Sequence, residues 1–454
     1  MDGNSTVRIG IEGGDQQVVA HVGLHALGAF ADRLGLGVRL SEQIGWAGER
    51  APVHDRGTVL TQAMLTLAGG GESCADIEHL RSQARLFGPV PSDTTVWRTI
   101  DAIDPVTLDR LAAAMAETRA GVWSRTTATA GPVVLDIDAS IVEIHSENKE
   151  GTAPHFKGGF GFHPMFCFSD QTGEALAGVL RPGNANANTI ADHLTVLDQA
   201  IDQLPAEITL GHRRGDHPDL VNRPVMVRTD SAGCTHGFVT GCRARNIGFA
   251  VVARKNAQIH GAIGRVAVDD ERWTSAVRAD GEQRSDAHVA ELTDLVDLSG
   301  WPDRTRLIVR REPRHPGAQQ SLFPSDAFRY WGHYTDQTGT PAGLDVHMRA
   351  HAHVEDHIRR LKDSGLCRFP FASLDANRAW LALVCMAADL VRWFQLICCT
   401  GSLAAAEPKR MRWTFWHTPA RVVRRAGRDI VRVLDGWPTT NALLDAYQHI
   451  AALT

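Results

Sequence analysis

Two acidic residues on one apolar segment give the first chemical signal in the sequence. The run VVLDID places Asp136 and Asp138 two residues apart, and on a β-strand this spacing turns both side chains to the same face. Carboxylates on an apolar strand are costly to bury unless hydrogen bonds or a cation compensate their charge. The pair therefore indicates a metal or catalytic site. The alternative is that one Asp lies at the exposed strand end and caps the next turn.

A second apolar run, PVMVRTDSAG, repeats this arrangement. It ends in Asp230, which is followed by the small residues Ser231, Ala232 and Gly233. Sheets flanked by helices place ligands where a strand meets its following turn. An N-cap for the next helix would give the same pattern, but two such strands in one sheet favour a functional site.

The segment HAHVEDHIRRLKDSG contributes a third acid. On a helix, Glu355, Arg359 and Lys362 occupy positions i, i+4 and i+7 of one face. A surface ladder of salt bridges has the same pattern. Only the conjunction of Glu355 with the two Asp-bearing strands makes a functional role the better interpretation.

The three acids together suit metal-assisted phosphodiester chemistry. Such chemistry uses a pair of divalent cations to activate water and to stabilise the attacking and leaving oxygens. Carboxylate oxygens are the ligands that Mg²⁺ prefers. We therefore predict that Asp138, Asp230 and Glu355 are catalytic and hold two Mg²⁺ ions, for which Mn²⁺ can substitute, with Asp136 as the alternative to Asp138.

The surrounding periodicity predicts the elements that position these acids. Residues 131–260 alternate in the order β-β-β-α-β-α-β, which predicts a mixed sheet covered by helices, as in ribonuclease-H-like α/β domains. We expect five regions: a mostly helical segment for DNA binding or dimerisation (1–130), the first part of the core (131–260), a β-rich insertion (261–344), the second part of the core with the Glu helix (345–400) and a basic helical C-terminal region (401–454).

Composition limits the class of protein. The chain has 454 residues with 47 Lys+Arg against 52 Asp+Glu, a formal net charge of -5, which argues against a uniformly basic coat protein. Its eight cysteines form no CxxC pair, and the start has no signal-peptide pattern, so we expect a reduced cytoplasmic location. The apolar stretch from Ala379 contains Asp389 and Arg392, which favours a buried helix over a membrane span.

Four blocks of the sequence carry a family resemblance: LDIDASIVEIHSENKEGTAPHFKGGFGFHPMFCF, TGEALAGVLRPGNANANTIADH, RTDSAG and VEDHIRRLKDSGL. They resemble DDE transposases of bacterial insertion sequences, notably the IS thirteen-eighty group, from about residue 20 to the C-terminus. The resemblance implies a ribonuclease-H-like core, Mg²⁺-dependent cleavage at transposon ends and joining of the 3′-OH to target DNA. It also implies double-stranded DNA as partner, a homodimer in the synaptic complex, and association with the nucleoid when DNA is bound.

The family's acids fall on Asp138, Asp230 and Glu355. Related transposases carry a Tyr-x2-Arg-x3-Glu-x6-Lys signature, of which this chain keeps the Glu and Lys362. Met348 stands at the Tyr position and His351 at the Arg position, so the DNA contacts of those residues do not carry over, and a hairpin intermediate is left open. Arg349 is a substitute for the Arg in a different register.

Candidate DNA contacts lie outside the acids. Residues 401–433 contain eight Lys and Arg against two acids, and such side chains neutralise phosphates. Trp413 and Trp416 interleave with this tract and could stack on bases or belong to the core. Trp331 in YWGHY is a candidate wedge for a distorted DNA end. The full set of predicted DNA contacts is Arg349, Arg359, Lys362, Trp331, Arg410, Arg424 and Arg425.

Three other functions fit parts of the sequence. His353 and His357 are spaced i, i+4 as in a zinc site, but the order H-V-E-D-H places Glu third, whereas zinc proteases have H-E-x-x-H. A nuclease without strand transfer would use the same three acids. An inactive DNA-binding relic is disfavoured because all three acids are present.

Overall fold

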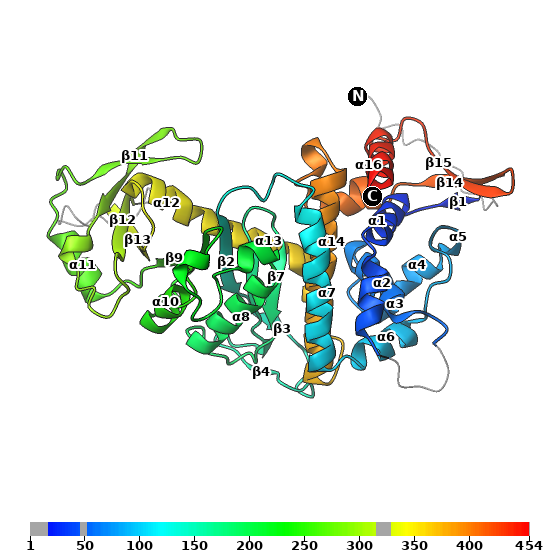
Figure 1. The fold of residues 1–454 in the computed structure, drawn as a ribbon, viewed down its shortest axis with the longest axis horizontal. Helices are drawn as coiled ribbons and strands as arrows, with labels where there is room; N and C mark the ends of the chain where they lie inside the picture. Colours follow the sequence, from blue (N-terminus) through cyan, green and yellow to red (C-terminus); the bar gives the residue numbers. More distant parts are fainter. Residues whose placement is uncertain (1–16, 46–51, 315–327, 454) are drawn as a thin grey trace, which may run out of the picture.

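The computed structural model describes residues 17–45, 52–314 and 328–453. Its main feature is one mixed sheet of nine strands in the order β10-β11-β12-β13-β9-β8-β2-β6-β7, which runs from the centre to one end of an elongated molecule (Figure 1). The strands are β2 (Val133–Ala139), β6 (Met165–Ser169), β7 (Ala175–Val179), β8 (Val225–Thr229), β9 (Gly248–Val252), β10 (Thr274–Val277), β11 (Gln283–Glu291), β12 (Arg306–Pro313) and β13 (Phe328–Thr335).

Five of these strands form the predicted core. β6 and β7 pair antiparallel on one side of β2, and β8 and β9 continue parallel to β2 on the other side. The helices α8 (Ile190–Asp202) and α10 (His236–Arg243) connect the strands. The predicted mixed α/β sheet with an antiparallel start and a parallel continuation is therefore confirmed. A small separate sheet pairs β3 (Val142–Glu143), β5 (Phe160–Phe162) and β4 (Ala153–Pro154).

The region after β9 is rich in β-strands, as predicted, and it extends the core sheet. β13 pairs antiparallel with β9, bringing Thr335 opposite Ala250, and β12, β11 and β10 follow in turn. One short helix, α11 (Ala257–Gly264), lies between β9 and β10, and another, α9 (Ala206–Thr209), precedes β8 in the core. The sheet is thus continuous across the predicted boundary at residue 261.

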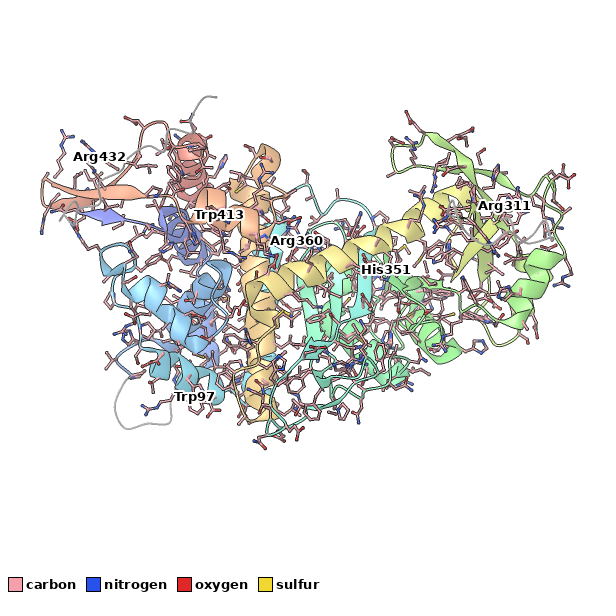
Figure 2. All side chains as sticks on the ribbon, turned by 180° about the vertical axis from the view of Figure 1, so that it is seen from behind. Trp97, Arg311, His351, Arg360, Trp413 and Arg432 are labelled. Carbon is pink, nitrogen blue, oxygen red and sulfur yellow. The ribbon has the colours of Figure 1, made fainter. Side chains whose placement is uncertain are left out.

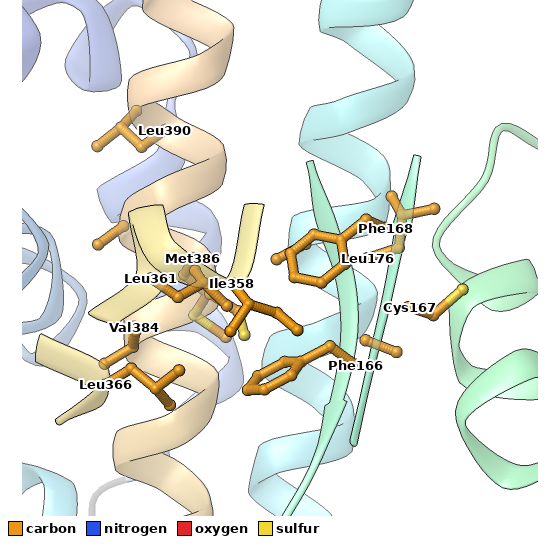
Figure 3. Packing of buried hydrophobic residues seen from close by; sticks show 14 of the residues in the cluster. Phe166, Cys167, Phe168, Leu176, Ile358, Leu361, Leu366, Val384, Met386 and Leu390 are labelled. Carbon is orange, nitrogen blue, oxygen red and sulfur yellow. The ribbon is translucent and has the colours of Figure 1, made fainter. Parts of the chain in front are cut away.

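A nearly continuous helical run crosses one face of this sheet. It consists of α12 (Pro341–Arg349), the short turn Ala350–Ala352 and α13 (His353–Leu361), and it reaches from the β10–β13 end to the centre of the molecule (Figure 2). Phe166 and Phe168 of β6 point toward Ile358 of α13, while Cys167 between them points away (Figure 3). The alternation of β6 thus gives α13 an apolar surface on which to pack.

The N-terminal helices pack beside the core sheet around one long central helix, α14 (Leu374–Cys398). By length and composition α14 could cross a membrane, but 67% of its most apolar window is buried inside the protein, which is typical of a core helix and agrees with the sequence-based interpretation. The N-terminal helices are α1 (Val22–Arg33), α2 (Leu36–Gln43), α3 (Arg56–Ala68), α4 (Glu78–Arg81), α5 (Ala84–Phe87), α6 (Asp93–Asp101) and α7 (Pro105–Trp123).

The C-terminal region is not wholly helical, and that prediction was wrong. Between α15 (Pro408–Met411) and α16 (Thr440–Ala452), β14 (Ala420–Arg425) and β15 (Arg428–Val433) form a hairpin that also pairs with β1 (Val18–Val19). Ala426 and Gly427 both have positive φ, 50° and 78°, as two-residue hairpin turns require. The alternation in ARVVRR and RDIVRV therefore has a strand period, which the density of arginines obscured.

A buried charge network joins α7, β7 and α14. Arg119 donates to Glu174 at 2.8 Å and to Asp389 at 2.5 Å, and Trp123 and Trp393 donate to the same Glu174 carboxylate at 2.7 and 2.5 Å. Burial raises the pKa of Asp389 to about 7, although the charge of Arg119 opposes this shift. Every charge in the network depends on Arg119 for its compensation.

Replacing Arg119 by Ala should destabilise the protein strongly. The substitution leaves two carboxylates buried without a cation, a situation that costs about 3–5 kcal/mol. Denaturant-induced unfolding followed by circular dichroism measures the loss. Arg39→Ala, which removes an exposed pair with Glu117, is the matched control and should change stability by less than about 1 kcal/mol. Equal effects of the two substitutions would contradict the assigned role of Arg119.

Candidate active site

A buried ion pair links the two strands that carry the candidate aspartates. Arg228 of β8 lies opposite Asp136 of β2 and donates to its two carboxylate oxygens at 2.8 and 2.6 Å. Both side chains are fully buried. His351 Nδ1 lies 2.8 Å from the same Asp136 carboxylate. Burial alone would raise the pKa of Asp136, but the bonds from His351 and Arg228 outweigh it and hold that pKa below its ordinary value.

Arg228 also contacts the helical run above the sheet. It donates to the His347 backbone carbonyl at 2.7 Å and pairs with Asp170 at 3.0 Å. Asp170 in turn lies 2.9 Å from His353 Nδ1 at the start of α13. The strands and the helical run are thus tied together by one set of polar contacts.

Asp138 lies in a different electrostatic environment from Asp136. It is partly buried, and its carboxylate accepts a hydrogen bond from its neighbour's backbone, the Ala139 N–H, at 2.7 Å. Burial, with added repulsion from the charges of Asp230 and Glu355, raises the pKa of Asp138 to about 6. The repulsion means that the three predicted acids are electrostatic neighbours, whereas Asp136 is already neutralised by its partners.

Asp230 and Glu355 complete this acidic group from two further elements. Asp230 directly follows β8 and accepts a hydrogen bond from the Ala232 N–H at 2.8 Å. Glu355 is exposed in the first turn of α13. Asp138 and Asp230 thus lie at the carboxyl ends of the adjacent parallel strands β2 and β8, and Glu355, on α13, is close enough for its charge to act on Asp138.

The spacing of these residues follows from the buried cluster beneath them. Asp138 is two residues beyond Asp136 on one strand, and Asp230 is two residues beyond Arg228 on the next, so each shares a face with its predecessor. Glu355 is four residues beyond His351, about one helical turn. Asp136, Arg228 and His351, named here the anchor cluster, thus lie one step below the three acids.

Arg228, His351 and Asp170 were not predicted as site residues. Arg228 stands in an apolar strand, where a charge needs a buried partner, and Asp136 lies on the neighbouring strand of the predicted sheet. That pairing was the available signal. His351, which stands where the family signature has Arg, bonds to Asp136. Met348 is buried at the sheet surface beside Val134 and Met226.

The predicted DNA contacts near the acids have mixed environments. Arg349 donates to Asp345 at 2.9 Å. Arg359 is paired with Asp356 and with Glu407 of the segment before α15. Structural partners therefore engage Arg349 and Arg359.

The other two candidates are Lys362 and Trp331. Lys362 is partly buried at the end of α13. Trp331 lies on β13 with the Arg310 guanidinium 5.0 Å from its ring centre.

The basic C-terminal tract has a more exposed character. Arg410 is exposed and donates to Ser402 at 3.1 Å, and Arg424 and Arg425 are exposed on the hairpin. Of the two tryptophans in this tract, Trp416 is buried in the core and Trp413 is 83% exposed (Figure 2).

The three acids are chemically suited to a hard divalent cation, but their side chains are not grouped around a single ion position. Asp138, Asp230 and Glu355 offer carboxylate oxygens, and their mutual repulsion is what a cation would relieve. Across residues 17–45, 52–314 and 328–453, no three His, Cys, Asp or Glu side chains are grouped as ligands of one ion. The zinc alternative gains no support, because His353 is bonded to Asp170 and His357 is partly buried beside Phe168.

The fold and site define an α/β protein with an acidic group at the carboxyl ends of its parallel strands. The family model described as Transposase DDE domain group 1 matches residues 1–454, so the chain belongs to this family of DNA-transposition enzymes. No curated protein matches the sequence. Among solved structures, the cryo-EM structure of a piggyBac transposase synaptic complex with hairpin DNA is similar, at 8% identity and a TM-score of 0.44, covering 88% of this chain and 80% of that one.

Replacing Asp136 by Asn should lower the free energy of unfolding of the protein. The neutral amide leaves the buried Arg228 charge without its main partner, which costs about 3–5 kcal/mol. Chemical denaturation measures the difference. The control is Asp375→Asn, which removes an exposed pair with Arg378 and should cost less than about 1 kcal/mol. A fully stable Asp136→Asn variant would argue against the anchor cluster.

Asp138→Asn should instead stabilise the metal-free protein at neutral pH. Because folding raises the pKa of Asp138 from 3.8 to about 6, ionised Asp138 opposes folding above that pKa, and the cost disappears as pH falls through both values. The gain should be about 1–3 kcal/mol near pH 8 and about half that near pH 5. Thermal unfolding in EDTA at the two pH values measures it, and a pH-independent loss of stability would contradict this charge assignment.

Proposed function

We propose that this protein is a transposase that cleaves the ends of an insertion sequence by metal-dependent phosphodiester hydrolysis and joins the 3′-OH to target DNA. One observation carries the proposal: burial at the end of β2, with added repulsion from Asp230 and Glu355, destabilises the Asp138 carboxylate as an anion and raises its pKa to about 6. Uncompensated carboxylates at strand ends suit cation binding better than a structural role. Family membership supports the reaction class.

In this proposal Asp138, Asp230 and Glu355 hold two Mg²⁺ ions, with Mn²⁺ as a substitute. The ions would lower the pKa of water and stabilise charge on the phosphorane oxygens. The chain's own contribution is orientation. The Ala139 and Ala232 N–H groups each bond to an aspartate oxygen, which restricts both side chains, and the anchor cluster fixes the strand ends relative to α13.

The same chain offers contacts for the DNA substrate. Lys362 follows Glu355 by seven residues on one helical run and would approach a phosphate near the site. Arg359 would have to exchange its Glu407 partner for a phosphate, and Arg349 its Asp345 partner. Further phosphate contacts would come from Arg410, Arg424 and Arg425, and Trp331 would wedge a distorted end.

The proposal extends to the transposase group, the DNA ends, the oligomeric state and the location of the protein. We place the protein in the IS thirteen-eighty group, acting on terminal inverted repeats as a homodimer in the synaptic complex, in the cytoplasm. The helical residues 1–130 would contribute end recognition or dimerisation. A nuclease without strand transfer is the main alternative, and joining of a cleaved 3′-OH end to a second duplex distinguishes the two.

Replacing Asp230 by Asn should abolish strand cleavage and preserve DNA binding. The substitution removes a ligand charge and alters no contact of the anchor cluster, and loss of a metal-ligating acid should lower the rate by at least about a hundredfold. Purified protein is incubated with Mg²⁺ and DNA carrying the terminal repeats, and the products are resolved on denaturing gels.

The matched control for this experiment is Asp202→Asn, an exposed aspartate on α8 paired with Arg213. It should cleave as the unmodified protein does. Unchanged cleavage by the Asp230→Asn variant would refute the assignment, and cleavage by the unmodified protein without any strand transfer would favour the nuclease.

A further inference from the structure

The β14–β15 hairpin has two chemically different faces. Cross-strand partners lie on the same face of a paired ribbon, so the register separates the side chains. The inner face holds Ala420 and Val422, each 1% exposed, opposite Val433 and Val431. The outer face pairs Val423 with Ile430 at its centre and has two arginine pairs at its ends, Arg421 with Arg432 and Arg425 with Arg428.

Two arginines directly opposite each other repel and destabilise a hairpin. Arg425, Arg428 and Arg432 are exposed, and within the described part of the chain no carboxylate forms an ion pair with any of them. The single acid of the hairpin, Asp429, lies on the inner face opposite Arg424 and interacts with Arg85 at 3.7 Å. The outer face therefore carries positive charge that folding alone does not use.

The arginines of β12 show the opposite arrangement. Arg306 pairs with Glu291 at 2.6 Å and Arg310 pairs with Asp345 at 3.0 Å. Arg311 lies 4.4 Å from the centre of the Trp273 ring. Where arginines support the fold of this protein, the chain thus supplies an acid or an aromatic ring beside them. Among the residues that the structure describes, Arg425, Arg428 and Arg432 have no such acid or aromatic ring beside them, which indicates an external anion.

The shape of the hairpin selects duplex DNA among polyanions. The hairpin projects from the end of the molecule opposite β10–β13 (Figure 1), and Arg432 lies at its margin (Figure 2). A two-stranded ribbon fits the DNA major groove, whose walls are rows of phosphates. A ribbon with arginines along both strands can reach both walls, whereas its central Val423 and Ile430 are too few for an extended apolar interface.

We propose that the outer face of this hairpin, through Arg425, Arg428 and Arg432, binds the phosphate backbone of duplex DNA in a sequence-independent manner. The proposal rests on the proposed function, because that function requires a DNA substrate. It refines the predicted basic tract by assigning phosphate contact to one face of one hairpin. The hairpin lies away from the three acids along the molecule (Figure 1), so it would hold DNA outside the cleavage site.

The test measures binding of full-length protein to a short mixed-sequence duplex over a series of KCl concentrations. Each lost phosphate contact lowers the slope of log affinity against log salt by about 1. The Arg428→Gln/Arg432→Gln variant should therefore lose about 2 from this slope and bind at least about tenfold more weakly at low salt. The control Arg213→Gln/Arg378→Gln removes the same charge from exposed arginines paired with Asp202 and Asp375, and it should keep the slope.

Three outcomes would overturn the proposal, and one would support it. A hairpin variant that is folded by circular dichroism and keeps the slope and affinity overturns it, as does a variant that changes only the self-association measured by light scattering. An equal loss of slope in both double variants also overturns it, because net charge alone would then explain binding. Salt-dependent loss in the hairpin variant alone supports it. If that loss occurs but the unmodified protein does not cleave transposon ends, the proposed function fails while the hairpin proposal stands.

Discussion

The geometry of the acidic site depends on one buried interaction, the bidentate pair between Arg228 and Asp136. It joins two parallel strands through side chains as well as through their backbone ladder. His351 adds the helical run to the same carboxylate. Since breaking a buried pair leaves an uncompensated charge, small relative shifts of these three elements are costly. The anchor cluster therefore fixes the sheet and α13 relative to each other, and the three acids follow one step beyond it.

The structure gives Asp136 and Asp138 different roles, which the sequence alone could not distinguish. Asp136 and Asp138 share a strand face, yet the first is paired with Arg228 and His351, whereas the second is partly buried, has no ion-pair partner in the described ranges and is repelled by Asp230 and Glu355. The first stabilises the fold as an anion, whereas ionisation of the second opposes folding. Such opposed environments for adjacent carboxylates are typical of sites where stability is exchanged for reactivity.

The core sheet could be predicted because its signals are local, and the three acids were proposed from the same local patterns. The apolar periodicity of a strand or a helix can be recognised within ten or fifteen residues. Asp230 and Glu355 lie at the ends of elements that this periodicity defines. The anchor cluster was missed because, apart from the isolated Arg228 in an apolar strand, it depends on contacts between residues 92 and 215 positions apart. The hairpin was missed for another reason: its five arginines obscured the short strand period, in which Ala420, Val422, Val431 and Val433 mark the inner face.

The formal net charge of -5 is compatible with a DNA-acting enzyme once the partners of the charges are known. Many arginines of this chain, among them Arg119, Arg228, Arg306 and Arg310, are neutralised by acids within the fold, and these add nothing to an external field. A polyanion is attracted by a local excess of positive charge, which the net charge of the whole chain does not reveal. The hairpin's outer face concentrates such an excess because its cross-strand partners are themselves arginines. Placement of charge, rather than its total, is therefore the property of this sequence that bears on DNA.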